Sequence, residues 1–103
     1  MSIEVKILLN EQGRPVGKLA DAEIHFTGGE LAGLKLVGFA IWQRRDGSGH
    51  SVSFPSRPFI VHGDRKNFAL LRAINDPSAQ NHIRSLLLHE YEAHTHEGVG
   101  AAT

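Results

Sequence analysis

An Asp-Pro pair ahead of an amphipathic segment gives the clearest local signal in this chain and predicts a helix near the C-terminus. Asp76 is a favourable N-cap, and Pro77 suits the first helical position, where a missing N–H costs nothing. Apolar residues then recur at helical spacing, at Ala79, Ile83, Leu86, Leu87 and Tyr91. Polar residues lie on the opposite face of the predicted helix, at Gln80, Arg84 and Glu92. We expect Gly98 to end the helix.

The residues before this helix have the patterns of strands and turns. Apolar and polar residues alternate over 3–9 and 19–26, whereas 34–42 is almost continuously apolar. The turn formers of 46–49 then predict a hairpin with a strand at 50–54. Shorter segments predict two more strands, at 59–61 and 67–74, with a turn at 62–64 between them. The expected fold is therefore α+β, an antiparallel β-sheet of five to six strands followed by one C-terminal α-helix.

Two details of the strand region carry further expectations. Gly38 interrupts an apolar strand, which predicts a bulge or a close backbone approach. Pro55 ends the strand before it, because proline cannot donate to a sheet, and Pro55 and Pro58 bracket Ser56 and Arg57. We expect the two prolines to hold this Pro-Ser-Arg segment extended or in an abrupt turn.

A chain of 103 residues is most simply one domain. We assign 1–97 to that domain and 98–103 to a flexible tail. Because one helix covers only one face of a sheet, we expect a homodimer to cover the remainder. Trp42 and Leu88 are the candidate interface residues, unless they are scattered apolar residues of an ordinary surface.

Several classes of protein are excluded or disfavoured by composition. The chain has no cysteine, which excludes disulfide scaffolds and thiolate metal sites. No apolar run approaches the roughly 20 residues that span a bilayer, and the start does not resemble a signal peptide. We therefore expect a cytoplasmic protein that does not associate with membranes.

The net charge is zero, but the charges are unevenly distributed. Residues 31–75 carry seven basic residues against two acidic ones, a net charge of +5, whereas both flanks are acidic. A local positive field attracts phosphates even when the total charge vanishes. The candidate phosphate-binding residues are Arg44, Arg45, Arg57, Arg65 and Lys66. The alternative is that these bases only solvate strand edges.

Aromatic side chains close to these bases offer possible stacking surfaces. The candidates are Trp42, Phe54 and Phe59. The alternative is that these rings belong to the core, which we favour for Phe54.

Catalytic and metal chemistry find little support in the sequence. A zinc peptidase helix needs histidines four residues apart, whereas His89 and His94 are five apart, and His94 with His96 form a poor helical chelate. The serines near His50 lack a Gly-x-Ser-x-Gly context. We expect no enzyme activity, catalytic residue, metal or cofactor.

The order of these segments resembles the stage V sporulation protein G (SpoVG) family of septation regulators. The resemblance covers roughly residues 3 to 92. It is carried by Phe54-Pro55-Ser56-Arg57, by Ile74-Asn75 before the helix, and by Ile83 and Leu87-Leu88-His89-Glu90-Tyr91 within it.

This resemblance implies a small bacterial regulatory dimer that binds DNA or RNA without catalysis. Arg57 matches the basic residue that follows Pro-Ser in the family, and Arg65 and Lys66 fall in its charged loop. The alternative function is a protein–protein interaction module that uses a sheet edge or the helix and binds no nucleic acid.

Overall fold

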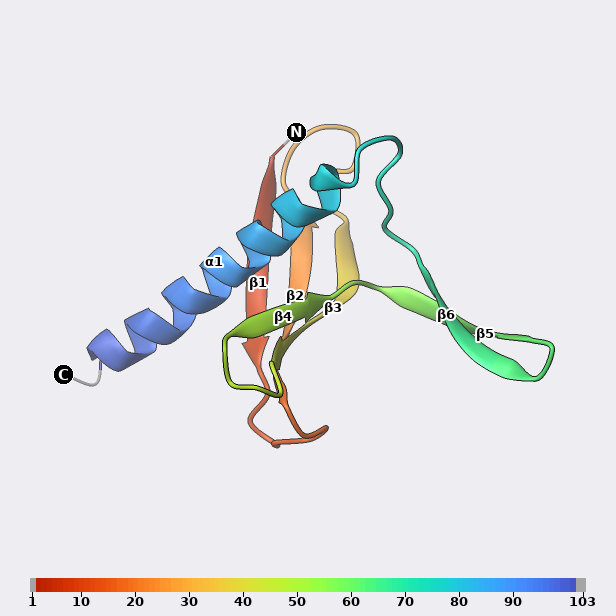
Figure 1. Cartoon of the computed structure of the whole chain (residues 1–103). Coiled ribbons are helices and arrows are strands. Elements are labelled where there is room, and N and C mark those ends of the chain that lie inside the picture. The colour runs from red at the N-terminus through yellow and green to blue at the C-terminus, as the bar shows by residue number, and fades with distance from the viewer. Residues whose placement is uncertain (1, 102–103) are drawn as a thin grey trace.

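The computed structural model describes the backbone of residues 2–101 and the side chains of residues 2–95. Six strands precede one helix within this range, which confirms the α+β fold and the predicted order of elements (Figure 1). The elements are β1 (Ile3–Leu9), β2 (Lys18–Phe26), β3 (Lys35–Gln43), β4 (His50–Ser53), β5 (Ser56–Val61), β6 (Asp64–Ala69) and α1 (Ser78–Ala101).

The six strands divide between two antiparallel sheets instead of forming a single one. Four of them form the main sheet in the order β1-β2-β3-β4, and β5 pairs only with β6. This second pair, residues 56–69, is called the ribbon below, and it projects away from the main sheet (Figure 1). Buried Pro55 separates the two sheets because it offers no N–H for continued pairing. Its carbonyl accepts the Leu70 N–H at 2.9 Å, which closes the base of the ribbon.

The core lies between α1 and one face of the main sheet (Figure 1). The predicted alternation in β2 is confirmed, because Ala20, Ala22 and Ile24 are all buried. Two clusters result: one joins Ala22 and Ile24 to Phe39 and Leu87, and the other joins Ala20 to Ile41 and Tyr91.

Three helix positions differ from the sequence prediction. Leu88 packs against the second cluster, so it is partly a core residue. Gln80 donates from Nε2 to the Leu71 carbonyl at 3.2 Å, and the Arg84 guanidinium lies 4.9 Å from the centre of the Phe54 ring. Both polar side chains therefore contact segments beside the helix. The sequence had instead placed them on the face of the helix that points to solvent. Helical spacing alone could not show these neighbours.

The face of the main sheet opposite α1 is largely polar. His25 and Glu23 form a hydrogen bond of 2.9 Å there, and Lys35 lies 3.4 Å from the same carboxylate. The His25 bond, and then Lys35, hold the pKa of Glu23 below its usual value. Lys18 pairs with Asp21 at 2.6 Å. Most of this face is therefore suited to water.

The start of α1 is confirmed, but its predicted end is wrong. Asp76 Oδ1 accepts the Ser78 N–H at 2.9 Å, and this bond lowers the pKa of Asp76. The helix continues past Gly98 to Ala101. A glycine inside a helix costs about 1 kcal/mol relative to alanine, but it retains the N–H that continues the hydrogen bonding.

Residues 102–103 of the predicted tail lie outside the described range. Within that range, no helix has both the length and the apolarity needed to cross a membrane.

Gly38 combines both features expected of it. Between Ala22↔Phe39 and Ile24↔Leu36 the register shifts, because β3 carries one residue more than β2 at this point. Gly38 has φ 109°, and a Cβ placed there would lie 3.0 Å from the Pro55 Cβ. The bulge thus packs against the proline that separates the two sheets.

Candidate nucleic-acid interface

The ribbon is built around a two-residue turn. His62 and Gly63 have φ values of 51° and 82°, and Val61 pairs with Asp64 across them. Positive φ at both central residues is typical of a type I′ hairpin, whose twist matches that of the flanking strands. The predicted turn at 62–64 is therefore confirmed in its central residues.

The structure decides two local predictions at the strands of the ribbon. Ser56 and Arg57 lie inside β5, so of the two conformations predicted for the Pro-Ser-Arg segment the extended one is confirmed and the turn is not. Extended backbone is compatible with the φ that proline imposes, especially in a strand at a sheet edge. The strand predicted at 67–74 instead spans Asp64–Ala69 and stops short of Leu70.

The pairing register decides which side chains share a face of the ribbon. Directly paired residues project to the same side, and successive pairs alternate. We call one side the aromatic face; its pairs are Arg57↔Phe68, Phe59↔Lys66 and Val61↔Asp64. The other side carries Ser56↔Ala69, Pro58↔Asn67 and Ile60↔Arg65.

The five predicted phosphate-binding residues fall into two groups. Arg57, Arg65 and Lys66 are exposed on the ribbon, with Arg65 on the side opposite the aromatic face. None of these three takes part in an ion pair with any residue that the structure describes.

Arg44 and Arg45 form the second group, at the turn between β3 and β4. This turn lies at the end of β4 away from the ribbon (Figure 1). Arg44 Nε donates to the His50 carbonyl at 3.3 Å, and its charge helps to lower the pKa of Asp46, after the hydrogen bonds from Ser48. The fold therefore does not gather all five residues into one patch.

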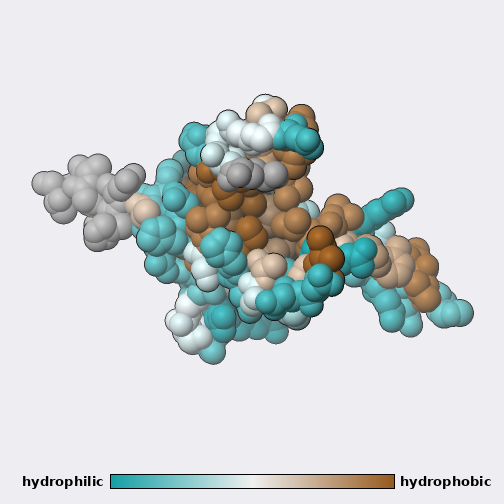
Figure 2. Space-filling view, turned by 90° about the horizontal axis from the view of Figure 1, so that it is seen from above, coloured by the Kyte–Doolittle hydropathy of each residue, from teal (hydrophilic) through white to brown (hydrophobic). Residues whose placement is uncertain are grey.

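Two phenylalanines of the ribbon form a cluster with an arginine that follows it. The rings of Phe59 and Phe68 lie edge to face, with centroids 6.0 Å apart and an interplanar angle of 77°. The guanidinium of Arg72, from the segment after β6, lies 4.0 Å from the centre of the Phe68 ring. Phe59 and Phe68 remain 37% and 45% exposed, beside a concave surface that Arg57 and Pro58 also line. Figure 2 shows hydrophobic and hydrophilic residues mixed on the projecting ribbon.

Of the three aromatic residues predicted to offer stacking surfaces, Phe59 alone lies on the ribbon. Phe54 packs against the core and meets Phe39 edge to face at 5.3 Å, which confirms its core assignment. Trp42 lies on the main sheet, where its Nε1 donates to Ser53 Oγ at 2.9 Å.

Sequence reasoning missed Phe68 and Arg72 as members of this site. For Phe68 the signal was the strand register that follows from the predicted turn, because a two-residue turn at His62-Gly63 places Phe68 opposite Arg57.

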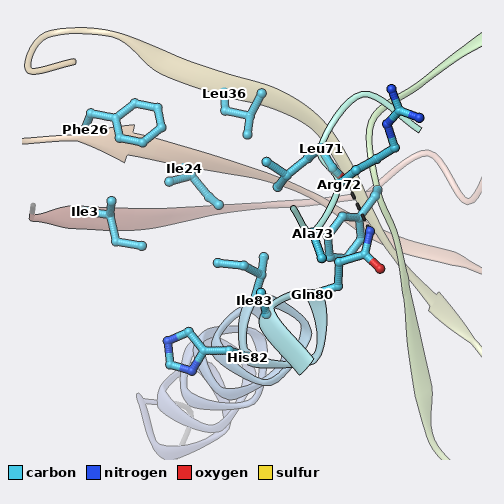
Figure 3. A pocket seen from close by; sticks show the side chains of 12 residues that line it. Ile3, Ile24, Phe26, Leu36, Leu71, Arg72, Ala73, Gln80, His82 and Ile83 are labelled. Carbon is cyan, nitrogen blue, oxygen red and sulfur yellow. Dashed lines mark hydrogen bonds between the residues drawn. The ribbon is translucent and has the colours of Figure 1, made fainter. Parts of the chain in front are cut away.

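An apolar groove lies at the opposite end of the core from the β1–β2 turn. It holds about 360 Å³ and opens between the first turns of α1, the segment after the ribbon and the ends of β1, β2 and β3 (Figure 3). Its main apolar lining residues are Ile3, Ile24, Phe26, Leu36, Leu71 and Ile83. Arg72 projects away from this lining (Figure 3), so the groove has little charge to orient a polar ligand.

The histidines do not assemble a metal site in the described part of the chain. No three histidine or carboxylate side chains up to Thr95 come close enough to hold an ion. The side chain of His96 lies outside the described residues.

Comparisons with models of protein families, with curated proteins and with solved structures found no match. The resemblance to the SpoVG family therefore stays a prediction from the sequence motifs.

Proposed function

We propose that this protein is a small, SpoVG-like bacterial regulator of the cytoplasm that binds nucleic acid without catalysing a reaction. The observation that carries the proposal is the projecting ribbon, which exposes Arg57, Arg65 and Lys66 with no ion-pair partner among the described residues. Unpaired cations on a protruding element can reach a polyanion without first breaking internal contacts. Arginine also contacts phosphate oxygens through two parallel N–H groups.

The small number of cations on the ribbon determines how strong the binding is and how it depends on salt. Each phosphate that a protein neutralises releases counterions, so affinity falls with salt at a slope of roughly 0.7 to 0.9 per contact. Because the whole chain has zero net charge, little long-range attraction adds to these local contacts. Binding is therefore expected to be weak at physiological salt and strong only when salt is low.

Charge reversal on the ribbon tests this function. Arg57→Glu with Arg65→Glu should weaken binding at least tenfold at low salt and reduce the salt slope by about 1.4 to 1.8, the sum for two lost contacts. The measurement is fluorescence anisotropy with labelled oligonucleotides over a salt series. Unchanged affinity in this variant would contradict the ribbon as the binding element.

Charge reversal at the β3–β4 turn provides a matched comparison. Arg44→Glu with Arg45→Glu makes the same change in net charge away from the ribbon (Figure 1). We expect a smaller loss of affinity, because these arginines lie at the other end of β4. An equal loss would instead assign binding to all five predicted residues.

The apolar groove supports the homodimer that the sequence led us to expect. The face of the main sheet opposite α1 is mostly polar, whereas Ile3 and the other lining residues leave apolar surface open at the groove. A second copy of the chain is the proposed cover. If no oligonucleotide binds even at low salt, the alternative of a protein–protein interaction module would replace the nucleic-acid proposal.

A further inference from the structure

We propose that the aromatic face of the ribbon binds single-stranded nucleic acid by stacking unpaired bases on Phe59 and on the Phe68–Arg72 pair. This inference rests on the proposed function and adds to it the form of nucleic acid that is recognised. It requires flat apolar groups and cations to be exposed together on one surface.

The pairing register places rings and cations side by side. Arg57 lies directly opposite Phe68, and Lys66 lies directly opposite Phe59. Each ring therefore has a cation as its cross-strand neighbour, within about 4.5–5.5 Å at Cβ. A single strand carries bases and phosphates at alternate positions along its length, so this surface matches its chemistry.

The two rings offer different surfaces to a base. Phe59 is 37% exposed and meets Phe68 edge to face, so part of its ring surface stays open to a ligand. One face of Phe68 is covered by the Arg72 guanidinium at 4.0 Å. A base on that side meets the guanidinium, and bases stack on arginine planes as they do on aromatic rings.

Duplex nucleic acid cannot use these groups in the same way. Paired bases are already stacked on one another, and a protein reaches only their edges and the phosphates. The cations of the ribbon would contact a duplex, but the phenylalanine faces would contribute nothing. The aromatic face therefore favours unpaired strands.

The charges on this face disfavour a second copy of the chain as its partner. Arg57, Lys66 and Arg72 accompany the two rings, whereas Asp64 at the tip is the only carboxylate in the three pairs of the aromatic face. Two such faces would bring like charges together on association, which is unfavourable. A flexible polyanion with exposed rings satisfies both kinds of group.

The first experiment uses the unmodified protein and needs no variant. Affinity is measured at low salt by fluorescence anisotropy for labelled oligothymidine, oligouridine, an abasic phosphodiester strand and a duplex, all of one length. The abasic strand keeps the phosphates and lacks the bases. We expect oligothymidine and oligouridine each to bind at least tenfold more tightly than the abasic strand and more tightly than the duplex. The ratio of the affinities for oligothymidine and oligouridine shows whether the site prefers DNA or RNA.

The second experiment removes the rings while keeping the side chains apolar. Phe59→Leu with Phe68→Leu should weaken binding of oligothymidine by roughly 5- to 150-fold for each base that loses its stack. Binding of the abasic strand should change little. Phe59→Tyr with Phe68→Tyr keeps both rings and should retain the affinity for oligothymidine. Ile60→Thr, on the opposite side of the ribbon and 75% exposed, is the matched control.

Three results overturn the inference. These are oligothymidine binding no more tightly than the abasic strand, the leucine variant keeping full affinity, and the tyrosine variant losing as much affinity as the leucine variant. In each of these cases the proposed function still stands if two conditions hold. The unmodified protein must bind the duplex and the abasic strand, and the variant Arg57→Glu with Arg65→Glu must lose that binding. If no probe binds at low salt, the proposed function fails, and this inference fails with it.

Discussion

Gly38 shows how one residue fixes the relation between the main sheet and the ribbon. Its φ of 109° lies in a region that side chains rarely adopt, and the Pro55 Cβ would lie 3.0 Å from an added Cβ. Pro55 in turn is buried and holds Leu70 through its carbonyl. The glycine thus permits the close packing of the bulge in β3 against the base of the ribbon.

We predict that Gly38→Ala lowers the free energy of unfolding by roughly 2–4 kcal/mol, because backbone strain and a crowded contact act together. Gly47→Ala is the matched control: its φ of 73° is also positive, but no atom lies within 4 Å of the added Cβ. Its cost should be about 1 kcal/mol. Urea denaturation followed by circular dichroism measures both, and equal costs would contradict the packing role of Gly38.

The ribbon is the element whose stability depends most on local features. An isolated two-stranded hairpin is only marginally stable in water, and all residues of β5 are exposed. Its stability therefore depends on the turn, on the Phe59–Phe68 contact and on the clamp at Pro55. Such an element opens more readily than the four-stranded sheet, which helps a binding element to adapt to a flexible ligand.

The turn offers a direct test of this dependence. His62 has φ 51°, and asparagine adopts this conformation more readily, so His62→Asn should stabilise the ribbon. His62→Val should destabilise it, since a β-branched residue resists positive φ. Limited trypsin digestion at Arg65 and Lys66, followed by mass spectrometry, should be at least about fivefold faster in the valine variant, given a left-handed cost of about 1–2 kcal/mol. Equal rates would show that the turn does not control ribbon opening.

At the scale of the whole molecule, the groove and the aromatic face of the ribbon are two apolar surfaces with different chemistry. The groove is almost purely apolar, whereas the aromatic face of the ribbon mixes rings with cations. The groove therefore suits a second copy of the chain, and the aromatic face suits a polyanion. A dimer formed through the groove would carry two ribbons, and two linked sites bind one long strand more tightly than either site does alone.

A charge placed in the groove tests the dimer. Ile3→Glu puts a carboxylate among apolar residues, so it should weaken association at least tenfold because an interfacial carboxylate would be desolvated without a partner. Val16→Glu is the matched control, 92% exposed in the β1–β2 turn away from the groove. Light scattering over a concentration series should give the mass of two chains for the unmodified protein and the control. A single-chain mass for the unmodified protein at every concentration would refute the dimer.

The features that local sequence determined are those whose causes lie within a few residues. Alternation in β2, the cap at Asp76, the turn at His62-Gly63 and the bulge at Gly38 were all predicted, because each depends on neighbouring side chains or on one backbone conformation. The α+β class followed from the order of these elements.

Only the tertiary structure decided where segments distant in sequence meet. It separated Arg44 and Arg45 from Arg57, directed β5 and β6 away from the main sheet, and placed Arg72 over Phe68. These relations depend on the direction in which each strand leaves its turn and on the packing of α1, and no local pattern encodes either one. The charges of residues 31–75 therefore predicted a basic region, whereas the fold determined which of its cations share a surface with Phe59 and Phe68.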